Sequence, residues 1–422
     1  MSSLILAVSG AQQQRSASAL NLRHLVGPGL LVAVGYVDPG NWATDIAGGA
    51  HFGYQLLSVV VLASVLAMVF QTLVARVVLA TGEDLASLSA RHLPRALAQA
   101  SWLAGEAAIL ATAFAEMVGG AIAFRILFDL PLPLGIALTG AATAVFLSLS
   151  RVGEGAHEKL INVLIGIVAV SFLVLLVQTG PDWSAAARGV SETGTALRSH
   201  EGLVIALGIL GATLMPHNLY LHAGMLAERV KGLRSQDRAL AGRIARNDTL
   251  VSLGLAMLVN AAIMIVAAAS LSGTGANVDS LIGAHAAMRD VLGVGAATIF
   301  AIALYAAGQS SAMTGMMAGR ILSKGFRGEA QKGGSRRRIV ARLIVAVAGV
   351  ALMQLTGRTD PDQLLVFSQV VLGVALPFAL VPLVILASRR SVMGAKVLSP
   401  VAATAAALTT AAIIGLNLFT LF

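Results

Sequence analysis

Apolar runs of about 20 residues recur along almost the whole chain, and they limit its fold more than any other feature. A run of this length crosses a lipid bilayer as one helix. Of the 422 residues, 57% are hydrophobic and only 12% are charged, which leaves more apolar surface than a soluble protein of this size buries. The sequence therefore predicts an all-α membrane protein, because helices satisfy their own backbone hydrogen bonds in lipid.

The apolar runs predict eleven transmembrane helices. They fall at about 25–50, 55–80, 100–127, 132–150, 160–178, 200–227, 248–272, 292–322, 339–356, 363–387 and 398–420. The same reading gives a polar N-terminal arm at 1–24, a polar connector at 179–199, and a loop with the eleventh helix at 389–422.

Basic residues gather in the loops that share a side with the N-terminus. The segments 228–247 and 323–338 are strongly basic, whereas the opposite loops carry few cations. Basic loops remain in the cytoplasm, so we expect a multi-pass protein of the plasma (inner) membrane. Its N-terminal arm would be cytoplasmic, and its 179–199 connector and C-terminus extracellular or periplasmic. This asymmetry explains the net charge of +9 without nucleic acid as a partner.

Enzyme function finds no support in the residue types present. The chain has no cysteine, which excludes disulfides, thiolate metal sites and cysteine nucleophiles. It has no His-Glu-x-x-His motif and no convincing pattern for a serine triad. We therefore expect that the protein is not an enzyme and has no permanently bound cofactor. Its expected surroundings are the lipid bilayer, with no obligatory protein partner.

Two apolar runs are interrupted by the same pattern, X-Pro-x-Asn. It occurs as DPGN at 38–41 in the first span and as MPHN at 215–218 in the sixth. Proline removes a backbone N–H and clashes with the preceding turn, so both helices should break there. The first and sixth spans are five crossings apart, which is an odd number. A block of five helices that begins at the sixth span therefore enters the membrane in the opposite sense to the first block of five. This predicts an inverted repeat of helices 1–5 (25–178) and 6–10 (200–388), with helices 1 and 6 broken and helix 11 appended.

The broken helices contain groups that can bind a cation. Asp38 is an ionisable residue within an apolar span, which is costly and usually functional. Asn41 adds an oxygen, and the carbonyls of Gly35 and Ala212 are candidates for further oxygens. These donors alone suit Na⁺, Ca²⁺ or Mg²⁺, but the thioether of Met215 favours softer ions such as Mn²⁺, Fe²⁺, Co²⁺ and Cd²⁺. The alternatives are a helix-capping role for Asp38 and a packing role for Met215.

These motifs resemble those of the natural resistance-associated macrophage protein (Nramp) family, in its bacterial manganese/iron transporter branch. Besides DPGN and MPH, the stretches AAGQSSAMTGMMAG (306–319) and FSQVVLGVALPFALVPL (367–383) are similar to family sequences. The likeness runs from about 27 to 393. It implies a LeuT-type fold and a secondary transporter. Such a transporter imports Mn²⁺ or Fe²⁺, and also Cd²⁺ or Co²⁺, by alternating access coupled to protons.

The resemblance also assigns site residues. It implies a metal site formed by Asp38, Asn41, Met215, Ala212, Gly35 and Gln369, the last approaching the metal as the site closes. The position of Gly35 is usually alanine in the family, a change that a backbone ligand tolerates. Methionine before the proline of MPH argues against the Mg²⁺-transporting relatives.

Candidate proton-pathway residues are Asp38, His217, Glu116, His222, Arg337 and Arg338. Asp38 is ionised beside a cation and protonates more readily in an empty apolar site, so metal and proton can compete or be coupled there. Ala113 stands where the family usually has an aspartate, so an uncoupled metal uniporter is one alternative. Another is a LeuT-fold transporter for a different substrate, such as a Na⁺-coupled amino acid, although Asp38 would repel a substrate carboxylate.

Overall fold

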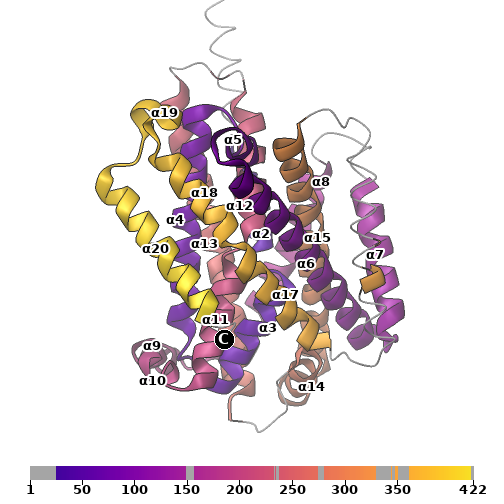
Figure 1. Cartoon of the computed structure of the whole chain (residues 1–422). Coiled ribbons are helices and arrows are strands. Elements are labelled where there is room, and N and C mark those ends of the chain that lie inside the picture. The colour runs from indigo at the N-terminus through magenta and orange to yellow at the C-terminus, as the bar shows by residue number, and fades with distance from the viewer. Residues whose placement is uncertain are drawn as a thin grey trace, which may run out of the picture.

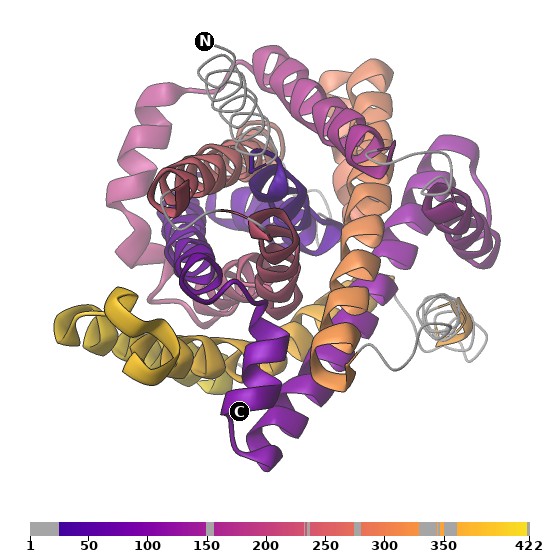
Figure 2. The same ribbon diagram turned by 90° about the horizontal axis from the view of Figure 1, so that it is seen from above.

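The computed structural model describes residues 25–148, 156–231, 233, 237–273, 280–328, 344, 347–349 and 361–419. Every regular element within these ranges is a helix. Figure 1 shows most of the long helices running between the two ends of the molecule. In Figure 2, α2 (Pro28–Gly35) lies near the centre, whereas α7 (Leu132–Ser148) and α20 (Pro400–Phe419) lie at the rim.

Eight helical stretches of the described residues are long and apolar enough to cross a membrane. They are Leu57–Thr81, Arg95–Phe128, Glu158–Thr179, His200–Val230, Arg238–Leu271, Val294–Arg327, Ser368–Ser388 and Pro400–Leu418. The pair formed by α2 and α3 (Pro39–Phe52) and the shorter apolar helix α7 account for two more predicted spans. The predicted span at 339–356 lies outside the described residues apart from 344 and 347–349, and the arm at 1–24 lies outside them entirely.

The first and sixth spans are broken where the sequence predicts. The helix α2 ends at Gly35 and α3 begins at Pro39, while α11 (His200–Thr213) ends just before α12 (Pro216–Val230). Each proline occupies the first position of its helix, where no N–H is needed. The tenth span is also interrupted, between α17 (Pro361–Ala375) and α18 (Pro377–Ser388), and this break was not predicted.

Five of the other spans are continuous helices that pack around the broken ones. They are α4 (Leu57–Thr81), α6 (Arg95–Phe128), α8 (Ala156–Thr179), α13 (Arg238–Leu271) and α15 (Val294–Arg327). Trp42 of α3 is fully buried, and its ring meets Phe172 of α8 at 4.8 Å and Phe300 of α15 at 5.5 Å between ring centroids. Aromatic packing of this kind fixes the position of α3 between the long helices.

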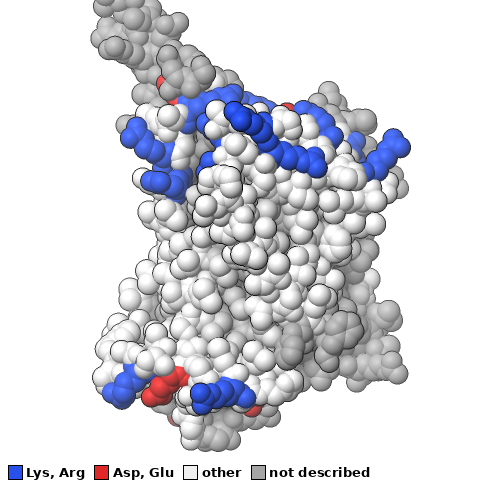
Figure 3. Space-filling model, turned by 60° about the vertical axis from the view of Figure 1, so that its left-hand side comes forward, with Lys and Arg blue, Asp and Glu red and all other residues white. Residues whose placement is uncertain are grey.

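Short helices lie at the two ends of the bundle. The helices α5 (Leu85–His92) and α19 (Arg390–Met393) lie at one end, and α9 (Trp183–Ser191), α10 (Thr193–Ala196) and α14 (Leu281–Leu292) at the other (Figure 1). Lysine and arginine gather at the α5 end, and a broad belt without charge separates the two ends (Figure 3). The belt has the surface expected of a segment surrounded by lipid.

Candidate functional site

Asp38 occupies the break between α2 and α3 and is completely buried. It is the N-cap of α3, and its Oδ1 accepts hydrogen bonds from the backbone N–H and the side-chain amide of Asn41, both at 2.8 Å. A capping carboxylate satisfies an amide that the helix leaves free. The other oxygen, Oδ2, is buried without a hydrogen-bond partner among the described groups. One oxygen therefore orders the start of the helix while the other makes no hydrogen bond among the described groups.

Met215 occupies the matching break between α11 and α12. It is the N-cap of α12 and is 1% exposed. Its thioether accepts a hydrogen bond from the side-chain amide of Asn218, with 3.6 Å between Nδ2 and Sδ. The Met215 sulfur, a soft donor, therefore lies at a helix break, and the hydrogen bond from Asn218 orients it.

The two prolines explain why Gly35 and Ala212 have free carbonyls. In an α-helix the carbonyl of residue i accepts the N–H of residue i+4. Pro39 and Pro216 stand four residues after Gly35 and Ala212, and proline has no N–H to donate. Both carbonyls proposed as backbone ligands therefore lack their helical donor.

Side chains from the second repeat contact the break in the first span. The Thr213 hydroxyl, at the end of α11, donates to Asn41 Oδ1 at 3.4 Å. Asn218 of α12 lies against Gly35, where a Cβ would come within 2.5 Å of its Nδ2. Gln369 of α17 lies directly on Gly40, in the first turn of α3. The structure therefore brings the six predicted metal-site residues together around two facing helix breaks.

This group of donors differs from a resident metal centre. Among the residues that the structure describes, no three His, Asp or Glu side chains gather in a way that could hold a metal ion. The donors here are one carboxylate, amide oxygens, a thioether and backbone carbonyls. A mixed set of oxygen donors and one thioether is chemically suited to a divalent transition metal.

Two of the candidate proton-pathway residues lie beside this site. Glu116 belongs to α6, and His217 packs against that helix. His217 Nδ1 is 3.3 Å from the Thr112 hydroxyl, and its Nε2 is buried without a partner among the described groups. Glu116, one turn further along α6, is fully buried, and neither of its carboxylate oxygens has such a partner. The next turn carries Gly119, against which the Pro39 ring packs; a Cβ there would lie 2.5 Å from the ring. Glu116 and His217 are therefore close to the helix that begins at Asp38.

His222 belongs to a different cluster. Its Nδ1 is 2.8 Å from Gln71 Oε1, and Gln71 Nε2 donates to the Tyr36 hydroxyl at 2.9 Å. Its Nε2 is 3.5 Å from the Thr249 hydroxyl. Since Tyr36 lies in the unwound segment after α2, His222 reaches the site through a chain of hydrogen bonds and not directly.

The remaining proton-pathway predictions concern three other positions. Ala113 is buried on α6, one turn before Glu116, and supplies no proton-binding group. Arg337 and Arg338 lie outside the described residues.

Sequence reasoning assigned no role to two buried polar residues near the site. Asp45 is 1% exposed, has one carboxylate oxygen without a partner among the described groups, and lies two turns after Asp38 on α3. It is a second carboxylate within the same apolar run, so the reasoning applied to Asp38 also singles it out. The second such residue is Asn218. The X-Pro-x-Asn pattern that it shares with Asn41 is the sequence feature that could have identified it.

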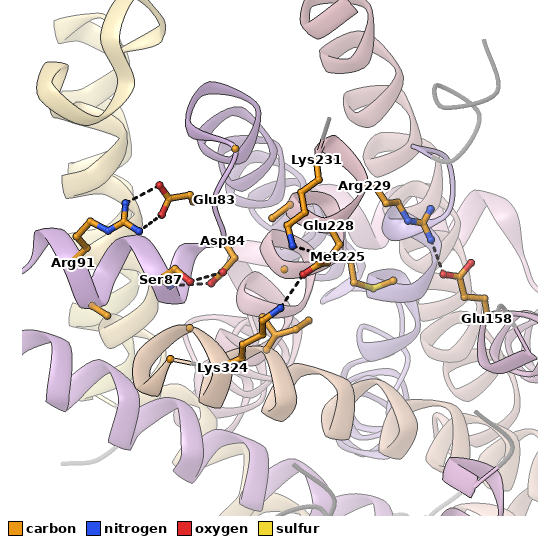
Figure 4. Close-up of a pocket in the computed structure, with 17 residues that line it drawn as sticks. Glu83, Asp84, Ser87, Arg91, Glu158, Met225, Glu228, Arg229, Lys231 and Lys324 are labelled. Atoms are coloured by element: carbon orange, nitrogen blue, oxygen red, sulfur yellow. Dashed lines mark hydrogen bonds and ion pairs between the residues drawn. The ribbon is translucent and has the colours of Figure 1, made fainter. Parts of the chain in front are cut away.

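A cavity of about 730 Å³ opens at the α5 end of the bundle. Its lining comes from α5, α12, α15 and the start of α8 (Figure 4). Glu228 lies at its centre and pairs with Lys324 of α15 at 3.1 Å and with Lys231 at 2.7 Å. The pair with Lys324 joins the end of α12 to α15, whereas Lys231 is a local partner three residues after Glu228.

A second set of contacts ties the start of α2 to its neighbours. Arg229 of α12 pairs with Glu158 of α8 at 2.6 Å and donates to the Val26 carbonyl at 2.7 Å. Asp248 of α13 accepts the backbone N–H of Gly29 at 2.7 Å, as anions do at helix N-termini. These contacts hold the start of α2 against α8, α12 and α13.

Comparisons with known proteins found relatives along nearly the whole chain. A family model described as "Natural resistance-associated macrophage protein-like" (Nramp) matches residues 29–422. A divalent metal cation transporter MntH from Brucella suis is 43% identical over 394 residues, which cover 93% of this chain and 86% of that protein. The crystal structure of a manganese transporter from Eremococcus coleocola, in complex with an aromatic bis-isothiourea substituted compound, has a TM-score of 0.84 and 34% identity. That match covers 95% of this chain and 86% of the other. The transporter MhsT, in complex with L-phenylalanine, has a TM-score of 0.61 at 15% identity over 94% of this chain and 98% of its own, a likeness of fold alone.

Proposed function

This chain belongs to the Nramp family, and on that premise we propose that it imports divalent transition-metal ions, Mn²⁺ or Fe²⁺ with Cd²⁺ and Co²⁺ as further cargo. The observation that carries the proposal is the placing of Asp38 and Met215, one hard and one soft donor, in two facing helix breaks. Asn41, the carbonyls of Gly35 and Ala212, and Gln369 complete the proposed ligand set. Related proteins named as divalent metal cation transporters support the same cargo.

The transport cycle we propose is alternating access. The bound ion joins one broken helix from each repeat, so movement of the repeats opens the site to one side and then the other. The ties of Arg229 and Glu228 at the α5 end would have to separate for release on that side. The basic residues at that end favour placing it, with the N-terminal arm, in the cytoplasm. The 179–199 connector and the C-terminus would then face outward from the plasma (inner) membrane.

Proton coupling is a further part of the proposal. Asp38 loses a proton when it binds a metal ion, and His217 and Glu116 lie near enough to pass that proton along α6. His222 can contribute only through Gln71 and Tyr36. With Ala113 in place of an acidic residue, the coupling would be weaker than in a chain with two carboxylates on this face of α6.

The test uses purified protein in proteoliposomes, with Mn²⁺ uptake and internal pH followed together. We expect Mn²⁺ uptake that persists in excess Ca²⁺ or Mg²⁺ and acidifies the lumen. Uptake without acidification would retain the metal site and overturn the proton coupling. Absence of uptake, with Na⁺-driven amino acid transport in its place, would overturn the proposed cargo.

A further inference from the structure

The two half-helices at the site begin with the same hydrogen-bonded unit. In α3 the N-cap Asp38 is followed by proline, and the amide of the third helical residue, Asn41, donates to Asp38 Oδ1 at 2.8 Å. In α12 the N-cap Met215 is followed by proline, and the amide of the third helical residue, Asn218, donates to Met215 Sδ at 3.6 Å. In both repeats an asparagine amide therefore holds the side chain that we propose as a metal ligand.

We propose that Asn218 is a positioning residue of the metal site, which orients the Met215 thioether and so sets the preference for soft ions. The inference rests on the proposed function, since it assigns a task within the same site. Met215 packs against Ala108, Leu372 and Ala375, but these apolar contacts do not fix the direction of the sulfur electron pairs, because methionine is unbranched and adapts to its surroundings. A fixed N–H donor on the sulfur leaves its remaining electron pair in one direction, where an ion can meet it.

The fit of Asn218 depends on the residue at position 35. A Cβ at Gly35 would lie 2.5 Å from Asn218 Nδ2 and 2.6 Å from its Oδ1, closer than real Cβ atoms approach other atoms. The amide of Asn218 therefore rests on the backbone at the end of α2, next to the carbonyl proposed as a ligand. An alanine at this position would have to move Asn218, and with it the hydrogen bond to Met215.

The burial of Asn218 agrees with a role at the site. The side chain is fully buried, and its Oδ1 has no hydrogen-bond partner among the described groups. A buried amide with an unmet oxygen is unfavourable for folding, so a residue that only fills space would be better apolar. A packing role predicts equal effects on all ions, whereas a role through the sulfur predicts a larger effect on Cd²⁺, the softer ion, than on Mn²⁺.

The experiment measures the dissociation constants of Cd²⁺ and Mn²⁺ on the purified full chain by isothermal titration calorimetry. Asn218→Leu keeps the approximate size of the side chain and removes the donor. We expect Cd²⁺ to bind roughly fivefold more weakly, the value of one lost hydrogen bond, while Mn²⁺ changes by less than about twofold. In a Met215→Ala background the same substitution should no longer alter Cd²⁺ binding. Tyr220→Phe is the matched control, because it removes a buried hydroxyl from the same helix that bonds to the Phe378 carbonyl at 3.4 Å.

Gly35→Ala is a second route to the same result, because it displaces Asn218 without changing it. We expect it to weaken Cd²⁺ more than Mn²⁺, and Asn218→Ser in that background to relieve the steric clash without restoring the preference for Cd²⁺. Equal losses for both ions, no loss in either variant, or an Asn218→Leu effect that persists without Met215 would overturn the inference while leaving the proposed function in place. A wild-type chain that binds neither ion would refute the proposed function itself.

Discussion

Replacing Asp38 by asparagine separates its proposed metal-binding charge from its structural task. The substitution keeps the size of the side chain, and asparagine is as good an N-cap as aspartate. The hydrogen bonds that Asn41 donates to Oδ1 at 2.8 Å can therefore persist, and we expect the thermal stability of the empty protein to change little. The buried Oδ2, which has no partner among the described groups, becomes an amide nitrogen that cannot bind a cation.

The expected loss of affinity is large because the charge is fully buried. Removing one partner from a buried charge contact costs about 2–5 kcal/mol. At about 1.4 kcal/mol per factor of ten, the Mn²⁺ dissociation constant should rise between about 30-fold and about 4,000-fold. Titration calorimetry on purified protein measures this constant, and uptake into proteoliposomes should fall with it.

The control for this variant is Asp182→Asn. Asp182 is the N-cap of α9, at the end of the bundle opposite α5, and accepts the backbone N–H of Ser184 at 2.8 Å. It is the same change at a helix start remote from the metal site, so Mn²⁺ binding should be unaffected. Wild-type Mn²⁺ affinity in Asp38→Asn would show that the site has been assigned wrongly.

Three further perturbations test other parts of the molecule. Met215→Ala should keep part of the Mn²⁺ uptake while admitting Ca²⁺ and Mg²⁺ as competitors; unchanged Ca²⁺ exclusion together with unchanged Cd²⁺ affinity would remove Met215 from the ligand set. Ala113→Asp should increase the protons carried per Mn²⁺, seen as faster acidification of proteoliposomes, and an unaltered proton flux would refute the role given to this position. Arg229→Gln should break the tie to Glu158 and loosen α12 beside the cavity at the α5 end; because the chain has no cysteine, thiol labelling of Ala227→Cys, a buried position in the cavity lining, reports this loosening, and equal labelling with and without Arg229 would refute it.

Features encoded within a few residues of one another were predictable from the sequence. Apolar length predicted the transmembrane helices, and the two prolines predicted the breaks at Asp38 and Met215. The break at Leu376 was not predicted, although Pro377 follows it, because no polar residue stands next to this proline as Asp38 and His217 do at the other two breaks. Short helices in polar loops, such as α5, lack the long periodic pattern on which helix prediction depends.

Contacts between distant segments were beyond the reach of one sequence. The metal-site residues could be named from motifs, but the seating of Gln369 on Gly40 depends on how α17 packs against α3. The pair of Arg229 and Glu158 joins residues 71 positions apart. Charged side chains in loops have many possible partners, and only the packed bundle selects among them.

The division of the site between two similar half-helices bears on how such a protein can arise. If the two repeats descend from one gene whose product paired with itself, the ancestral ion lay on a two-fold axis and met identical residues from both copies. Such a dimer offers two carboxylates or two thioethers, never one of each. One carboxylate together with one thioether therefore requires that the gene was duplicated and that the two copies then diverged. Ion discrimination by a mixed pair of donors is, on this view, a property that only the duplicated gene could acquire.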